Sequence, residues 1–471
     1  MESDLSRLPQ GSRLPWLLAA AGLVMGTAGC ATETERAAES DLRRQSDALA
    51  EQRRALPKAP RHARREGLGG DLETWVQRAM RDSPELRAAY QAYRAKTLHI
   101  ARARRLPDPV LTYGYYIRSV ETRVGPQRHR FGLRQMLPWP GSLSAGSDAV
   151  AAEARAEARM LEAARLGLRL RVARAFYALW RVRQQRIIEA EQRALLEQLA
   201  ESASLHMSTG HVSLPQVLQL NLAVTRRTDR LAALGQQERA AQARLLAAVG
   251  AEGDAISGGV GIDDGAVRPE VPALELSQLR ERALRHPRIR RYDELAEARD
   301  AAGEKAGADA LPSFTLGVDY IETGEAMQSG VPDSGKDPIM AMVSVSLPIF
   351  GGSYDREQEA VAAEAAAMRA RGDQARDERE SELIAALAEV EDSARRIDFN
   401  RSTLVPQAQA AFESTATAYT TGRGSVASTL LSHRDLLEIQ QELIAAQHDH
   451  AVAWATLEEL VGEALARRPL R

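Results

Sequence analysis

The hydrophobic and polar positions of the chain form one long pattern that occurs twice. Each copy opens with an amphipathic segment that contains a proline, Pro84 in the first copy and Pro287 in the second. Apolar residues in these segments recur at helical spacing, whereas the residues after a later Leu-Pro stop alternate strictly, as in β-strands. We therefore expect a duplicated unit in which short helices lead to a β-hairpin, with the first copy at 71–250 and the second at 273–463.

Four short segments alternate between apolar residues on one face and small or polar residues on the other. They are predicted strands at about 110–118, 129–137, 313–321 and 339–347. The alternation fits a half-buried sheet in a soluble domain, and it also fits membrane strands with lipid on one side and water on the other. A length of roughly 9–10 residues suits a tilted membrane strand. Leu133 and Val343 are then expected to face lipid, and Gly132 and Ser344 to face water.

The number of predicted strands has a consequence for assembly. Small membrane barrels need about eight strands, so four strands from one chain cannot close one. No segment of the mature chain approaches the ~20 apolar residues of a spanning helix. The predicted fold is therefore mainly α with a β-barrel part to which several chains contribute strands.

Each hairpin is followed by a very long segment rich in Ala, Glu, Arg and Leu. We predict long helices at about 143–208 and 353–420, followed by return helices at about 214–249 and 426–461. At 1.5 Å per residue, a helix of this length measures roughly 100 Å and must pack along its whole length, as helices in coiled coils do. Pro406 removes a backbone donor, so we expect a kink or break in the second long helix.

The turns between the long and return helices contain small and polar residues. Gly210 and Gly422 suit a backbone conformation with positive φ, and Ser213 and Ser425 are placed to cap the return helices. If the helices project from a membrane, these residues and Arg423 lie at the far tip and contact a partner there. Ordinary helix-hairpin chemistry explains the same residues, so the tip assignment depends on the architecture.

Composition and charge exclude several functions. Lys plus Arg is 62 and Asp plus Glu is 64, so the chain lacks the basic excess of a nucleic-acid-binding protein. The sequence contains no P-loop, GxSxG or HExxH motif, and we predict no enzyme, no cofactor and no metal site. His448 and His450 are predicted to be surface residues, because positions two apart on a helix chelate one ion poorly. Met340 and Met342 suggest a path for soft metals, but ordinary filling of the barrel is the favoured interpretation.

The N-terminal segment resembles a secretory signal. Residues 1–29 contain arginines, an apolar run from Leu14 to Met25 and a small-residue stretch before Cys30, the only cysteine. We predict that Cys30 becomes the lipidated N-terminus and that 30–70 is an anchored N-terminal segment. The alternative is an ordinary cleaved signal with an incidental cysteine. Residues 251–272 are expected to be a linker and 464–471 a tail.

The duplicated unit resembles the TolC-like outer-membrane efflux protein family, in its lipoprotein branch. The resemblance covers about residues 71–463 and depends on the two hairpins and on the segments LPIFGGSYDREQEA (347–360) and YTTGRGSVASTLLSHRDLLEIQQELIAAQ (419–447). It implies a homotrimer with a twelve-stranded barrel in the outer membrane and an α-helical tunnel in the periplasm. It further implies a periplasmic adaptor and an inner-membrane pump as partners, with no nucleic acid.

The predicted function is a passive exit duct for exported small molecules or metal ions, anchored to outer-membrane lipid. A periplasmic coiled-coil lipoprotein scaffold without a pore is the alternative. Amphipathic strands that end in Leu-Pro distinguish the two, because a scaffold has no need of them.

Overall fold

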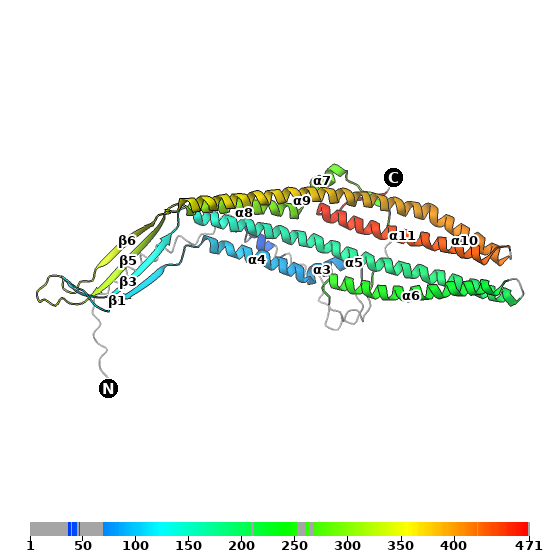
Figure 1. Cartoon of the computed structure of the whole chain (residues 1–471), viewed down its shortest axis with the longest axis horizontal. Helices are drawn as coiled ribbons and strands as arrows, with labels where there is room; N and C mark the ends of the chain where they lie inside the picture. Colours follow the sequence, from blue (N-terminus) through cyan, green and yellow to red (C-terminus); the bar gives the residue numbers. More distant parts are fainter. Residues whose placement is uncertain are drawn as a thin grey trace, which may run out of the picture. The chain divides into compact units, whose positions relative to one another are not determined.

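The computed structural model describes residues 36–38, 40–44, 47, 69–208, 212–251, 260–263, 267–421 and 423–469 (Figure 1). The chain divides into two compact units, and each unit combines corresponding segments of both copies. The first unit is built mainly from Ala92–Glu157 and Tyr292–Arg371, and the second from Ala158–Arg291 and Gly372–Arg471. Each copy of the sequence pattern therefore packs against the other copy rather than forming a domain of its own.

The first unit contains an antiparallel sheet whose strands lie in the order β1-β3-β5-β6 (Figure 1). The strands are β1 (Val110–Tyr115), β3 (Gly125–Leu137), β5 (Ser313–Thr323) and β6 (Ile339–Ser346), and a short β2 (Glu121–Thr122) pairs with β3. The β3–β5 pair joins the two copies, with Gly132 opposite Asp319. The four predicted strands are confirmed, although β3 begins four residues earlier than expected.

Four helical segments continue from the ends of this sheet. They belong to α4 (Pro84–Arg104), α5 (Ser142–Ser208), α8 (Pro287–Asp309) and α9 (Gly351–Phe399). Ion pairs tie neighbouring helices together: Glu153 of α5 binds both Lys96 of α4 at 2.8 Å and Arg299 of α8 at 3.2 Å. Arg299 also contacts Glu364 of α9 at 3.0 Å.

The predicted long helices form, and the second one is interrupted where the proline predicts it. Helix α5 runs unbroken for 67 residues. In the second copy, α9 is followed by a π-helical turn, η3 (Asn400–Leu404), and then by α10 (Val405–Thr420). The Val405 backbone N–H bonds to the Asn400 carbonyl. Because Pro406 cannot donate the next helical hydrogen bond, the helix accommodates one extra residue in this turn.

The return helices α6 (Leu214–Ala248) and α11 (Val426–Val461) begin and end within one residue of their predicted positions. Residues of α5, α6, α10 and α11 share one apolar cluster, which includes Leu196, Ala203, Leu220, Phe412 and Leu436. The Gly462 backbone, at φ 85, ends α11 in the left-handed conformation that glycine adopts without steric cost. Both helical hairpins of the second unit therefore depend on one core supplied by both copies.

Two prolines divide the opening segments of the copies as the sequence predicts. Pro84 begins α4 after α3 (Leu72–Asp82), and Pro287 begins α8 after α7 (Leu276–Ala283). Proline suits a first helical position because the backbone N–H there has no partner within the helix.

The segment between the copies and the C-terminal tail contain structure that the sequence does not predict. Strand β4 (Glu270–Pro272) pairs antiparallel with β7 (Arg467–Pro469). The Arg467 guanidinium lies 4.5 Å from the centre of the Trp454 ring, which fixes the tail on α11. Three-residue strands carry too little alternation to be recognised from sequence.

Candidate functional site

The strand register assigns every residue of the sheet to one of two faces, because directly opposed residues of paired strands share a face. One face is apolar and aromatic. Its residues include Leu111, Tyr113, Phe131, Leu133, Leu137, Phe314, Leu316, Val318, Tyr320, Ile339, Ala341, Val343 and Val345, and its polar exceptions are Gln135, His129 and Glu322. Much of this face is bare in the single chain: Leu111 is 76% exposed and Val343 is 67% exposed. A sheet in a soluble domain would cover such a face.

The opposite face of the sheet consists mostly of glycine, serine, threonine and methionine, and it carries one ion pair. Arg130 of β3 donates to Asp319 of β5 at 2.6 Å, although the two residues lie 189 positions apart in the sequence. Asp319 is only 2% exposed, because its carboxylate lies flat against the backbone of Gly132. A Cβ at Gly132 would stand 2.3 Å from the Asp319 Oδ1 atom. Gly132 therefore makes room for this ion pair.

The loops at one end of the sheet interlock. Glu121 of β2 accepts a hydrogen bond from the Met327 backbone N–H at 3.0 Å. Gly125 has φ +130, and a Cβ there would lie 1.8 Å from the Gly324 carbonyl oxygen. The loop between β5 and β6 is therefore fixed on the first hairpin by backbone contacts that only glycine permits.

The structure describes three of the five residues predicted at the turns. Gly210 and Gly422 lie outside the described residues, as does Cys30. Ser425 caps α11 by accepting from the Ser428 backbone N–H at 3.1 Å. Ser213 stands at the N-cap of α6, where its backbone N–H donates to the Gln216 side chain at 2.9 Å.

Arg423 and Gly424 complete the second turn. Both backbone N–H groups donate to the Ala418 carbonyl at 2.8 Å, which ends α10. A Cβ at Gly424 would stand 2.8 Å from the Tyr419 nitrogen, so this position requires glycine for space. The sequence TGRGS contains two glycines, and sequence analysis singled out only the first. Val217 and Val426, just beyond the two turns, share one apolar cluster, which brings the two turns to the same core.

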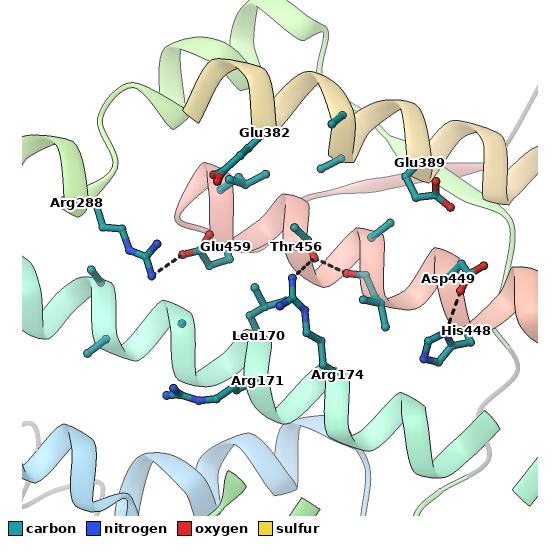
Figure 2. Close-up of a pocket in the computed structure, with 18 of the residues that line it drawn as sticks. Leu170, Arg171, Arg174, Arg288, Glu382, Glu389, His448, Asp449, Thr456 and Glu459 are labelled. Carbon is teal, nitrogen blue, oxygen red and sulfur yellow. Dashed lines mark hydrogen bonds and ion pairs between the residues drawn. The ribbon is translucent and has the colours of Figure 1, made fainter. Parts of the chain in front are cut away.

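An open cavity of about 810 Å³ lies among α5, α9 and α11 of the second unit (Figure 2). Arg174 of α5 reaches Thr456 of α11 at 3.4 Å, and Glu459 lies 3.9 Å from Arg288. The walls therefore carry both signs of charge. Among the described residues, no group of three or more histidine, cysteine, aspartate or glutamate side chains could hold a metal ion.

The histidines of α11 correct one prediction from the sequence. His448 is half-buried beside Asp449, but His450 is 2% exposed, so it is not a surface residue. Its Nδ1 atom lies 3.1 Å from the Ser393 hydroxyl of α9. Residues two apart on a helix point in nearly opposite directions, so one of the pair necessarily meets the packed side.

The part of the chain that the structure describes contains no helix that is both long and apolar enough to cross a membrane. A search of curated protein sequences finds no match. Residues 279–463 match the family model of the outer membrane efflux protein. This segment covers the second copy of the duplicated unit from α7 to the end of α11.

Solved structures of outer-membrane channels share the fold over most of the chain. The outer-membrane channel OprN superposes with a TM-score of 0.69 at 17% identity, covering 83% of this chain and 90% of that one. The outer membrane protein VceC of Vibrio cholerae gives 0.69 at 18%, covering 83% and 96%. A membrane protein from Pseudomonas aeruginosa gives 0.71 at 18%, covering 85% and 92%.

The family match and the solved structures cover different parts of the chain. Residues 279–463 match the outer membrane efflux protein family model, and both copies together have the fold of solved outer-membrane channels. The chain therefore has the fold of solved outer-membrane channels.

Proposed function

We propose that three copies of the chain form the exit duct of a tripartite efflux system. Each chain contributes β1, β3, β5 and β6, so three chains supply 3 × 4 = 12 strands to one closed barrel. The edges of β1 and β6 have no strand partner among the described residues. Closure between copies satisfies both edges, which would otherwise expose a row of backbone donors and acceptors to lipid.

The separation of the two sheet faces is the observation that carries this proposal. The uncovered apolar face suits lipid, and the opposite face, with Arg130 and Asp319, suits a water-filled lumen. A coiled-coil scaffold without a pore has no use for such a sheet. Transport is passive in this proposal, because the chain carries no nucleotide-binding motif to drive it. The cargo is a class of exported small molecules or metal ions.

The turns at the ends of the helical hairpins are proposed to contact the periplasmic adaptor, through which the inner-membrane pump connects. The contact residues are Gly210, Ser213, Gly422, Arg423 and Ser425. Support comes from the described part of the turns, where Ser213 and Ser425 begin the return helices and Arg423 closes the second turn.

The N-terminus is proposed to be anchored in the outer membrane by lipid on Cys30. Support comes from the sequence: Cys30 is the only cysteine and follows an apolar run and small residues. Ala31 after the cysteine does not resemble an inner-membrane retention signal, which favours the outer membrane.

The topology of the duct gives the test. If the helices lie in the periplasm, the interlocked loop between β5 and β6 faces outside, and a protease site placed within Gly324–Lys336 is cut on intact cells. The same site placed beside Ser213, at a turn, is the control and is cut only after the outer membrane is ruptured. Trimers that migrate as monomers after heating are expected on gels of outer-membrane extract. Cleavage of the loop site only in ruptured cells contradicts the proposed topology.

A further inference from the structure

The polar face of the sheet carries an excess of positive charge. Down the paired rows from Gly114–Arg130–Ile321 to Ser313–Ser346, the ionisable residues of this face are Arg130, Arg134 and Asp319. The other positions are threonine, serine, glycine, methionine, valine or isoleucine. Two arginines and one aspartate leave a net charge of 2 − 1 = +1 on each chain.

The three charges differ in what they present to solvent. The Asp319 side chain is 2% exposed, whereas the side chain of its partner Arg130 is 35% exposed. Gly132 allows this arrangement, because only a residue without a side chain leaves space for the Asp319 carboxylate against the β3 backbone. The negative charge is therefore hidden, and the guanidinium above it faces outward.

Arg134 adds a second cation without a carboxylate of its own. It lies one row beyond Asp319 on the same face, opposite Gly317, and forms no ion pair within the described residues. A Cβ at Gly317 would stand 3.2 Å from Arg134 Cγ, so the glycine provides the space in which this side chain lies. Two glycines thus hold the cluster of Arg130, Asp319 and Arg134, which we name the arginine cluster.

We propose that the arginine cluster gives the lumen a ring of positive charge that favours the passage of anions. This inference rests on the proposed trimeric duct, in which three clusters supply a net charge of +3. A lumen with low-dielectric walls concentrates such a field and enriches ions of opposite sign. The favoured cargo class is small molecules that carry a carboxylate, phosphate or sulfonate group.

A local chemical probe tests the sign of this field without depending on a gate elsewhere in the duct. Thr315 lies on the same face, one row from Arg134, so Thr315→Cys places a thiol beside the cluster. The background is Cys30→Ser, which removes the only native thiol. Full-length trimers in liposomes are treated with an anionic sulfonatoethyl thiosulfonate and with a cationic trimethylammonium thiosulfonate, and the two rates of labelling are compared.

We expect the anionic reagent to react faster. Arg134→Gln should lower the ratio of anionic to cationic rates by at least about threefold, since one charge acts over a few ångströms of water at each site. Asp319→Asn should raise the ratio. Ser329→Cys, in the loop between β5 and β6, is the control reporter, and its ratio should be the same in all backgrounds.

The outcomes separate this inference from the proposed duct. If Thr315→Cys reacts with neither reagent, the face is not water-lined and the proposed duct fails. If the thiol reacts with both reagents but the ratio of anionic to cationic rates is the same in Arg134→Gln and Asp319→Asn, the proposed duct stands. The inference about anions is then overturned.

Discussion

Arg379 of α9 donates a hydrogen bond to Glu459 of α11 at 2.9 Å, and both side chains are more than nine-tenths buried. The buried His286 at the start of the α8 segment also contacts Arg379, with its Nδ1 atom 3.1 Å from the guanidinium. His286, Arg379 and Glu459 therefore link the residues just before α8 to α9 and to the end of α11.

Removing one partner of the buried pair should be costly. Glu459→Gln leaves the Arg379 charge without its buried counter-charge, and we expect the free energy of unfolding to fall by about 3–5 kcal/mol. Glu382→Gln is the matched control, because Glu382 is 61% exposed and lies 3.9 Å from the same arginine. Thermal unfolding of detergent-solubilised trimers, followed by helical circular dichroism, gives the comparison. Equal effects of the two variants would mean that the buried pair is not a stabilising contact.

Three buried histidines should make the protein less stable in mild acid. Burial, helped by nearby Arg379, lowers the pKa of His286 to about 3, and burial lowers the pKa of His433 to about 4. Burial also lowers the pKa of His450. Because the unfolded chain takes up these protons near pH 6.5 and the folded chain does not, stability is complete above pH 6.5 and falls as the pH decreases toward 4.

His286 and His433 each contribute a slope of up to about 1.4 kcal/mol per pH unit in that window. His433→Gln should flatten the decrease in unfolding free energy between pH 6.5 and 4. Denaturant unfolding at a series of pH values measures the slope. A slope that His433→Gln does not alter contradicts the assignment.

The two faces of the sheet should respond differently to charge. Val343→Arg places a charge on the lipid face and should cost about 2–4 kcal/mol near the membrane midplane. Ser344→Arg, its neighbour on the polar face, should be milder. Gly132→Arg is also on the polar face, but its side chain would displace Asp319, so we expect it to weaken the trimer. Trimer yield in outer-membrane extracts is the measurement, and equal yields for Val343→Arg and Ser344→Arg would exclude membrane strands.

The second turn should not tolerate a side chain at Gly424. Gly424→Val drives a Cβ to 2.8 Å from the Tyr419 nitrogen, so the end of α10 must move. We expect trimers to persist while efflux, measured by antibiotic susceptibility, is reduced. Gly352→Val is the control, because a Cβ at Gly352 meets nothing within 4 Å. Normal efflux in Gly424→Val would place the adaptor contact elsewhere.

Replacement of the single cysteine tests the anchor. Cys30→Ser should abolish incorporation of radiolabelled palmitate, since the chain has no other thiol to acylate. Trimers should still reach the outer membrane, because in the proposed duct the barrel strands themselves keep the protein in the bilayer. Labelling that persists in Cys30→Ser would remove the anchor from the proposal.

The sequence alone determined the order of elements and most of their ends. Helix α11 begins after Ser425 and stops at Gly462, and Pro406 marks the π-helical turn, because caps, stops and missing donors act within a few residues. The alternation of each strand likewise identified its two faces before any partner strand was known. Such local signals survive in the sequence because they need no distant partner.

The tertiary structure alone decided which residues meet across the chain. Arg130 finds Asp319 only because β3 pairs with β5 in one register, and a shift by one residue would separate them onto opposite faces. His450 becomes buried because Ser393 of α9 packs against that side of α11. The pairing of β4 with β7 joins segments that are short and polar. In each case the deciding contact lies far away in sequence, and the physical cause is packing between elements rather than any property of one element.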